Sequence, residues 1–460
     1  RQPPPPPPPG SGLAIRERLH PCFLKDFSMT QYVLLKRCIE DILSVIKPVE
    51  DDRKKRLRAI QELTDSVNSV GALRGAAVKP FGSFVSNLYA KSGDLDVSVD
   101  LRSGSVLPRS KTKKQNVLRE LMRALQIRGV ARSVHFIPNA RVPVLQYVSN
   151  HFGISCDISI NNYPGQIKSR IFYWINTIDD RFGDIVLLVK EWAKAQNIND
   201  PKNGTLNSYS LCLLVLFHFQ TCEPAILPPL KDIYDGNVAA HIAGSFSCDE
   251  KHVDEVCLTN IARFLRRNTG QRNQSSVSKL LASFFLKVND CFRGIGDLSG
   301  QVISTYTGRF ERIQDNRSWM AKSYSLFIED PFERPDNAAR TVGAEEMQLI
   351  GCAFDYVSYR FTAGALADRN ELVSLLCTPT VRSILGYSVR DGRYKGYTES
   401  TASSQKFDRK QISSYFTEVY WPPDSTSINR ASDCRLYQSN NRSRVYTSTR
   451  LEPAIPYQSL

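Results

Sequence analysis

Three aspartates alternate with apolar residues in the segment DLDVSVDL at residues 94–101. This strict period of two predicts a half-buried strand whose apolar side chains face a core. Asp94 and Asp96 then lie on the same face, roughly 6.5–7 Å apart along the strand. Two carboxylates at that spacing can hold a pair of divalent ions, which lie about 3.5–4 Å apart in two-metal sites. Asp100 is roughly 13 Å from Asp96 by the same rise, so we expect it to be structural.

A second predicted strand, ISCDISI at residues 154–160, carries Asp157 on the face opposite its isoleucines. A neighbouring position in the sheet would bring Asp157 beside Asp94 and Asp96. Three converging carboxylates repel one another unless cations neutralise them, and ligands that are all oxygen suit Mg²⁺ or Mn²⁺. A single aspartate on a strand is usually a solvated edge residue. The combination instead predicts a metal site at Asp94, Asp96 and Asp157.

A Gly-Ser pair, Gly82 and Ser83, stands upstream of the first predicted strand. Glycine permits a close approach of the backbone, and serine adds a hydroxyl and an amide donor. We expect this turn to be followed by a helix over the sequence FVSNLYA. The N-terminus of that helix would hold phosphate oxygens.

The chain of 460 residues has a net charge of +14, from 60 Lys and Arg against 46 Asp and Glu. This excess favours an anionic partner, and nucleic acid is the usual one because its contacts with Lys and Arg release counterions. A solvated basic surface gives the same composition, so charge alone leaves both interpretations open. The 42% of hydrophobic residues is sufficient for two or three folded domains.

No apolar run is long enough for a membrane helix, because the longest, at residues 211–219, falls short of the roughly 20 residues required. The eleven cysteines are scattered without a C-x-x-C pair, which is typical of a reducing compartment. We therefore expect no membrane partner and a location in the cytoplasm, the nucleus or both. Cys248, His252 and Cys257 form one cluster, but their spacing is unlike the usual zinc sets and we expect no metal there.

The hydrophobic periodicity divides the chain into a helical start, a strand-rich middle and a helical remainder. It predicts helices over 29–47 and 50–70 and near 114–127, with strands and turns over the rest of 75–160. Helical patterns dominate from 166 onward. They fade beyond about residue 390, where polar runs cannot bury enough aliphatic surface to offset the ordering entropy. The seven consecutive prolines near the start predict a polyproline II segment or linker, either inert or a ligand for SH3-like or WW-like partners.

The order of Gly-Ser, D-x-D and a later strand aspartate is similar to the nucleotidyltransferase superfamily of DNA polymerase β type. Further segments resemble the non-canonical poly(A) polymerases and terminal uridylyltransferases, namely CDISINN (156–162), LLVKEWAKAQNIN (187–199), GTLNSYSLCLLVLFHFQ (204–220), ILPPL (226–230) and YSLFIEDPFERPDNAAR (324–340). The wording KPFGSFVSNLYAKSGDLDVSVDL is most similar to the plant terminal uridylyltransferases that tail small RNAs lacking 3′-end methylation. The similarity spans roughly residues 30–345.

The resemblance implies an α+β fold. A polymerase-β-like nucleotidyltransferase palm, with a mixed sheet and helices, would span 66–160. A helical PAP-associated central domain would combine 28–65 with 161–345, and the NTP would lie between the two. Residues 1–27 would form a proline-rich flexible tail, and 346–460 an extension that is largely disordered beyond about residue 390.

The resemblance also implies a reaction. Asp94 and Asp96 would hold two metals, and Asp157 would complete the catalytic one and help to activate the RNA 3′-hydroxyl. That hydroxyl would attack the α-phosphate of UTP, and pyrophosphate would leave. The implied partners are UTP and the RNA 3′ end, with unmethylated small RNAs as substrates, and small-RNA effector proteins remain open as further partners. Because no RNA-reading module is recognisable, RNA would be held by its backbone and 3′ end.

The same resemblance implies a second set of residues, which would contact the nucleotide. They would hold the triphosphate, meet the sugar hydroxyl and the base, or stack on the base, and they are Gly82, Ser83, Asn162, Lys190, Lys194, Ser208, Tyr209, Asp330, Glu333 and Asp336. Lys190 and Lys194 are four apart, hence on one face of a helix. Stacking on Tyr209 would give affinity for any base rather than a choice between bases.

The position of Asp336 bears on the choice of base. Several members of the family have a histidine there that favours uracil. An ionised carboxylate cannot donate to a uracil carbonyl, but it can accept from uracil N3–H or from an adenine amino group. A poly(A) polymerase that uses ATP is therefore the alternative activity. A catalytically inactive RNA-binding scaffold is the alternative from another class.

Overall fold

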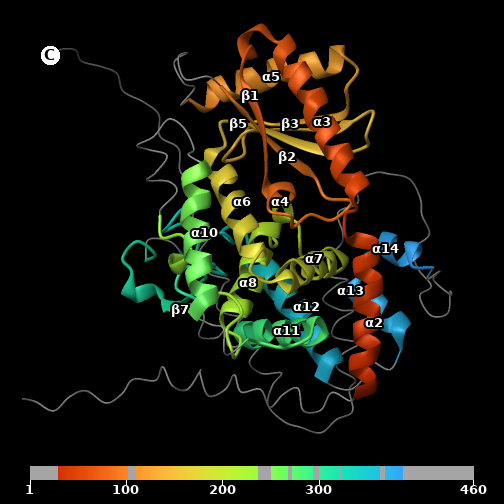
Figure 1. The fold of residues 1–460 in the computed structure, drawn as a ribbon, viewed down its shortest axis with the longest axis vertical. Helices are drawn as coiled ribbons and strands as arrows, with labels where there is room; N and C mark the ends of the chain where they lie inside the picture. The colour runs from red at the N-terminus through yellow and green to blue at the C-terminus, as the bar shows by residue number, and fades with distance from the viewer. Residues whose placement is uncertain are drawn as a thin grey trace, which may run out of the picture. The chain divides into compact units, whose positions relative to one another are not determined.

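The computed structural model describes residues 29–101, 110–236, 250–267, 272–293, 300–320, 323–362 and 368–386. These residues form an α+β fold, as predicted, in which a mixed sheet is joined to a larger set of helices (Figure 1). The proline-rich start and the polar segment beyond residue 390 lie outside the described residues. Within the described ranges, the structure has no helix of sufficient length and apolarity to cross a membrane.

A five-stranded sheet carries the three aspartates. Its strand order is β1-β2-β5-β4-β3, and within it the β2–β5 pair is parallel and the other pairs are antiparallel. The strands are β1 Ala77–Phe81, β2 Leu95–Asp100, β3 Ala131–Ile137, β4 Val144–Ser149 and β5 Ser155–Ile160. A parallel pair needs a long crossover. The chain between β2 and β5 supplies it with helix α5 (Lys111–Ile127) and the β3–β4 hairpin.

Helices α3 (Glu50–Ser69) and α5 build the core of the sheet region. Ala59, Leu63 and Val67 recur at four-residue spacing on α3 and are buried against the same cluster as the strand residues Val97 and Ile158. The resemblance places residues 28–65 in the helical domain. The structure instead places α3 on the sheet, because its apolar stripe finds its complement in the strands and in α5.

The polar face of β2 is also covered, which differs from the half-buried strand predicted. Ser98 and Asp100 are buried on that face. The Ser98 hydroxyl donates to Asp100 at 2.5 Å, and the Gln166 amide donates to both carboxylate oxygens of Asp100 at 3.1 and 2.9 Å. Asp100 therefore has the structural role that its distance from Asp96 predicts.

The second core is helical. Its helices are α2 Met29–Ile46, α6 Tyr163–Asn176, α7 Asp180–Ala195, α8 Ser208–Gln220, α10 Glu250–Arg267, α11 Val277–Arg293, α12 Ala344–Thr362, α13 Arg369–Leu376 and α14 Pro379–Ile384. Trp192 lies at the centre of this core, with ring centroids 4.7 Å from Phe285 and 4.6 Å from Phe354. Phe354 belongs to α12, so the helical core continues past residue 345, the end that the resemblance implies.

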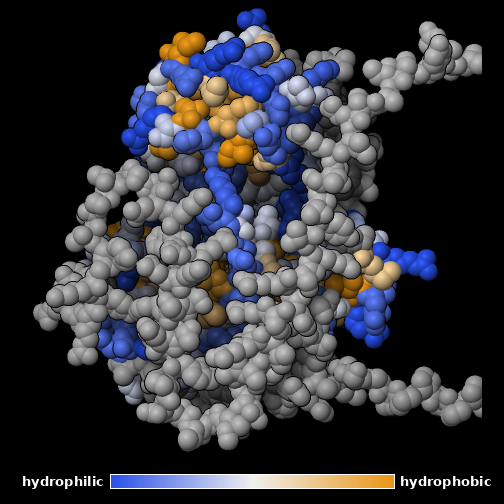
Figure 2. All heavy atoms as spheres, turned by 180° about the vertical axis from the view of Figure 1, so that it is seen from behind, coloured by the Kyte–Doolittle hydropathy of each residue, from blue (hydrophilic) through white to orange (hydrophobic). Residues whose placement is uncertain are grey.

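Shorter elements complete the described chain. Helix α4 (Gly82–Val85) follows β1, and β6 (Gln301–Ser304) pairs with β7 (Arg309–Arg312) as an antiparallel hairpin. Single 3-10 turns lie at Gly71–Leu73, Pro201–Asn203, Leu230–Asp232 and Ile313–Asp315. On the face shown in Figure 2, hydrophilic residues cover much of the sheet region, with smaller hydrophobic patches between them.

Candidate active site

The parallel pairing of β2 with β5 brings the three aspartates together. Asp96 is in register with Asp157 across the two strands, and Asp94 precedes β2 by one residue. Neighbouring strands lie about 4.7–4.9 Å apart, so the carboxylates of Asp96 and Asp157 are direct neighbours. Asp94 is exposed, and the other two are half-buried. The juxtaposition expected from the spacing of these acids is therefore present.

The three negative charges act on one another. Burial, followed by the charges of Asp157 and Asp94, raises the pKa of Asp96 to about 7, and only Lys190 acts against this rise. Burial and Asp94 also raise the pKa of Asp157, while hydrogen bonds from Gln146 lower it. Carboxylates whose ionisation is this unfavourable are poised to bind cations.

Gln146 on β4 holds the third carboxylate from the other side. It is in register with Asp157, and its Nε2 donates to the two carboxylate oxygens at 3.0 and 2.9 Å. In the part of the chain that the structure describes, no three His, Cys, Asp or Glu side chains are grouped so as to hold a metal. The oxygen-only donor set of Asp94, Asp96 and Asp157 still fits Mg²⁺ or Mn²⁺ by its chemistry.

Gly82 allows the chain to pass directly over Asp96. Its φ is +69°, and a Cβ built there would lie 2.0 Å from Oδ2 of Asp96. Only glycine satisfies both the left-handed backbone and this approach. The predicted helix after the turn is a single turn at Gly82–Val85, and the Gly82 amide donates to the Ser169 hydroxyl at 2.6 Å. The turn therefore lacks the longer helix that we had expected to hold phosphate.

Two lysines of α7 lie on the same helix face, as predicted from their spacing, but in different surroundings. Lys190 is half-buried and donates to the Leu88 carbonyl at 3.1 Å, whereas Lys194 is exposed. Burial lowers the pKa of Lys190, Lys194 lowers it further, and Asp96 and Asp94 oppose this change. Lys190 is thus the cation that faces the sheet carboxylates.

Asn162 and Ser208 lie near helix starts. Asn162 caps α6. Its side-chain oxygen accepts from the Gly165 backbone amide at 3.2 Å, and its backbone amide donates to the Ser98 hydroxyl at 2.9 Å. Ser208 begins α8 and donates to Asn199 at 3.2 Å. The next residue, Tyr209, points its hydroxyl at Asp330, so α8 connects these predicted contacts to the 329–337 loop.

The acids of the 329–337 loop are surrounded by donors. Lys168 of α6 donates to Asp330 at 2.6 Å and to Glu333 at 2.5 Å. The Tyr209 hydroxyl donates to Asp330 at 3.1 Å. Asp336 forms an ion pair with Arg141 at 2.7 Å, and Arg141 also lies 3.4 Å from Glu333. We call Lys168, Arg141, Asp330, Glu333 and Asp336 the loop network.

Comparisons with known proteins decide the family. Residues 35–176 match the family described as "Poly(A) RNA polymerase, mitochondrial-like, central palm domain". Protein HESO1 of Arabidopsis thaliana is 48% identical over 453 residues, which cover 94% of this chain and 88% of HESO1. The chain belongs to the poly(A) polymerase and terminal uridylyltransferase family. It is an RNA nucleotidyltransferase, and the predicted resemblance is confirmed.

Other members of this family extend the comparison. Terminal uridylyltransferase cid1 of Schizosaccharomyces pombe is 29% identical over 343 residues, covering 68% of this chain and 75% of cid1. A crystal structure of the Cid1 poly(U) polymerase with MgGTP bound covers 71% of this chain and 93% of its own, at a TM-score of 0.54 and 26% identity. A crystal structure of mtPAP with ATPγS has a TM-score of 0.57 at 20% identity, covering 80% of this chain and 75% of its own, and shows the common fold.

Three polar residues near the acids of this nucleotidyltransferase are not predicted from the sequence: Gln146, Lys168 and Arg141. Each meets its acid only through the tertiary fold, since Lys168 is 162 residues from Asp330 and Arg141 is 192 from Glu333. The one available signal was local. Gln146 occupies an alternate position on a predicted strand next to the aspartate strands, where an inward polar side chain needs a partner.

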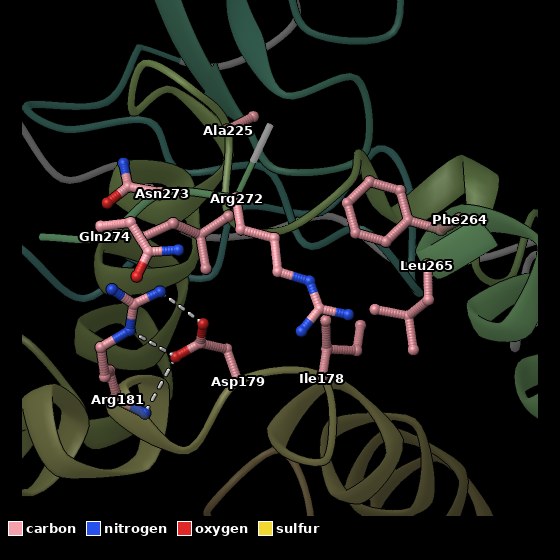
Figure 3. Close-up of a pocket in the computed structure, with 10 residues that line it drawn as sticks. Ile178, Asp179, Arg181, Ala225, Phe264, Leu265, Arg272, Asn273 and Gln274 are labelled. Atoms are coloured by element: carbon pink, nitrogen blue, oxygen red, sulfur yellow. Dashed lines mark hydrogen bonds and ion pairs between the residues drawn. The ribbon is translucent and has the colours of Figure 1, made fainter. Parts of the chain in front are cut away.

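The cavity drawn in Figure 3 lies elsewhere in the enzyme. It has a volume of about 600 Å³ and is lined by Ile178, Arg181, Phe264, Leu265 and Arg272 among others. Arg181 is neutralised there by Asp179 at 2.6 Å, and none of the residues predicted for catalysis lines it. The cluster of Cys248, His252 and Cys257 was considered as a zinc site. Cys248 lies outside the described residues, while His252 is exposed and Cys257 is buried on α10.

Proposed function

We propose that this nucleotidyltransferase is a template-independent RNA 3′-terminal uridylyltransferase, which adds uridines from UTP to RNA 3′ ends. The observation that carries the proposal is the in-register pair of Asp96 and Asp157, with Asp94 beside them, facing the Lys190 ammonium. The similarity to HESO1 and to terminal uridylyltransferase cid1 supports the choice of UTP.

The reaction exchanges one phosphate bond for another. The RNA 3′-oxygen bonds to the α-phosphorus of UTP, the bond from that phosphorus to the β-bridging oxygen breaks, and pyrophosphate leaves with its charge. Asp94, Asp96 and Asp157 would hold Mg²⁺ or Mn²⁺, which would neutralise the developing charge and lower the pKa of the hydroxyl. The hydroxyl proton passes to Asp157 or to water.

The remaining site residues position the nucleotide. Gly82 lets the backbone pass close to Asp96, and Ser83 offers a hydroxyl for a phosphate oxygen. Lys190, held by the Leu88 carbonyl, provides a fixed positive charge next to the carboxylates. Lys194 and Ser208 extend the contacts to the triphosphate, and Asn162 meets the sugar. The base stacks on Tyr209, whose orientation is set by its hydrogen bond to Asp330.

The RNA substrate follows from the lack of a recognisable RNA-reading module in the sequence. Contacts limited to the backbone and the 3′ end give weak sequence preference and strong salt dependence. We propose small RNAs with a free 3′-terminal ribose as the physiological substrates, in the cytoplasm, the nucleus or both. Small-RNA effector proteins that present such ends fit this role as partners.

The proposal is tested with the purified full chain, Mg²⁺, a labelled single-stranded RNA and each NTP in turn. UTP is expected to extend the RNA far more efficiently than ATP, and a 2′-O-methylated 3′ end is expected to be a poor acceptor. Extension mainly with ATP would contradict the choice of base but not the chemistry. No extension with any NTP, in Mg²⁺ or Mn²⁺, would favour the scaffold function.

A further inference from the structure

Each of the three acids of the loop network already meets at least one donor of the protein. One oxygen of Asp330 accepts from the Tyr209 hydroxyl and from the Phe332 amide, both at 3.1 Å, and the other accepts from Lys168. The Glu333 carboxylate meets Lys168 and Arg141, and the Asp336 carboxylate meets Arg141. The three carboxylates are therefore already engaged by the protein, and the groups with donors to spare are the cations.

Lys168 is the less exposed of the two cations in the loop network. Its side chain is 16% exposed, compared with 52% for Arg141. An ammonium has three N–H donors and no acceptor. Two of the donors are used by Asp330 and Glu333, and within the described chain no third acceptor is bonded to Nζ.

Lys168 also lies over the ring on which a base would stack. Its Nζ is 5.1 Å from the centroid of the Tyr209 ring. Offset-stacked aromatic rings have centroids about 4.5–7 Å apart, so a base stacked on Tyr209 would lie within reach of the ammonium. The base would then meet a group that can only donate.

We propose that Lys168, held by Asp330 and Glu333, selects uracil by donating to its O4 carbonyl. Uracil has an acceptor at this position, whereas cytosine and adenine have an amino group that would face the ammonium without an acceptor. A site that hydrogen-bonds one substrate group discriminates strongly against an analogue that leaves the site group unpaired. Asp336 then anchors Arg141 and does not read the base. This inference rests on the proposed use of UTP.

The test compares kcat/KM for UTP, CTP and ATP in the full chain and in Lys168→Gln, whose amide both donates and accepts. The preference for UTP over CTP is expected to fall by about 10- to 100-fold, as for a lost hydrogen bond to a charged group. CTP shares the O2 carbonyl of UTP and differs from it at N3 and at the 4-position, so 4-thio-UTP, which changes the 4-position alone, is needed beside this pair. Lys168→Arg, which keeps a donor-only group, is expected to retain most of the preference. Lys55→Gln removes another paired lysine on α3 and serves as the matched control.

Binding of UTP and CTP without RNA, by calorimetry, provides a readout independent of turnover and is expected to show the same change in ratio. 4-Thio-UTP tests the wild-type chain without any substitution, because sulfur is a weak acceptor. It should be used about tenfold less efficiently than UTP. Circular dichroism checks that the variants are folded.

The outcomes separate the two claims. If the wild-type chain prefers UTP but Lys168→Gln keeps that preference, or 4-thio-UTP is used as well as UTP, the inference is overturned while the proposed function stands. If the wild-type chain prefers ATP, the proposed function fails first, and this inference fails with it.

Discussion

The molecule holds two groups of acids in opposite electrostatic states. On the sheet, Asp94, Asp96 and Asp157 crowd together, and burial with mutual repulsion raises the pKa of Asp96 to about 7. In the loop network, Lys168 lies 2.6 Å from Asp330 and 2.5 Å from Glu333. The first group is incomplete without a cation from solution, whereas the second carries its own. We therefore propose that the uncompensated acids take part in the chemistry and that the compensated acids form a frame for recognition.

The largest expected effect comes from removing the sheet carboxylates. Asp94→Asn combined with Asp96→Asn should lower the rate of RNA tailing by about 1000-fold or more, because the metal ligands are lost. RNA binding, measured by filter retention, should change little. Asp65→Asn, an exposed acid on α3, is the control. Tailing that survives in the double variant would contradict the assignment of these acids.

The loop network should respond to substitution through stability. Lys168→Met leaves the buried Asp330 and the largely buried Glu333 without their common cation, which should reduce the free energy of unfolding by about 3–5 kcal/mol. Urea denaturation measures this change, and Lys55→Met provides the comparison for an exposed lysine. A loss below about 1 kcal/mol would mean that the loop acids are not compensated by Lys168.

Gln146 is the neutral hydrogen-bond donor to Asp157, one of the sheet acids. Gln146→Leu should reduce activity by about 10- to 100-fold, because Asp157 loses the donor that orients it. The Mn²⁺ concentration for half-maximal activity should rise, and Mn²⁺ binding followed by electron paramagnetic resonance should weaken. Gln115→Leu, which removes an amide bonded to the Pro138 carbonyl, should leave both unchanged. Equal effects of the two variants would contradict the role of Gln146 in positioning Asp157.

Replacing Asp96 or Asp100 of β2 by asparagine should change the free energy of unfolding in opposite directions. The pKa of Asp96 is raised above its unfolded value, so its contribution to stability is lost as the pH rises through the folded pKa of about 7. At pH 8 in EDTA, Asp96→Asn should therefore raise the free energy of unfolding by about 1–2 kcal/mol. Asp100→Asn should lower it, because Gln166 and Ser98 donate to the Asp100 carboxylate. The same sign for both variants would refute the contrast.

The smallest effect is expected at the rim of the loop network. Arg141→Gln breaks ion pairs to Asp336 and Glu333 whose arginine is 52% exposed. Exposed pairs contribute about 0–1 kcal/mol, so thermal unfolding should shift only slightly. A destabilisation comparable to that of Lys168→Met would show that the rim and the interior of the network do not differ.

The sheet acids could be predicted because their signal is local. The alternation in DLDVSVDL sets the face of Asp94 and Asp96, and the same period sets that of Asp157. Pairing of β2 with β5 was the remaining step, and the resemblance to the nucleotidyltransferase superfamily implied that the three acids converge. The helices at 29–46 and 50–69 were equally predictable from their apolar stripes.

The loop network could not be predicted, because its bonds join distant segments. Asp336 alone indicated an acceptor near the base, and only the structure pairs it with Arg141. The packing of α3 on the sheet is a similar case, since its apolar stripe at Leu63 and Val67 suits a helical core as well as a sheet. The local hydrophobic pattern predicts which face of a helix or strand is buried, and tertiary contacts determine what that face packs against.

Competition between nucleotides tests the central claim most directly. The purified full chain is given Mg²⁺, an RNA with a free 3′-hydroxyl, and UTP and ATP at equal concentration, and the added tails are sequenced. The account predicts tails composed almost entirely of uridine. Tails composed mainly of adenosine would contradict it.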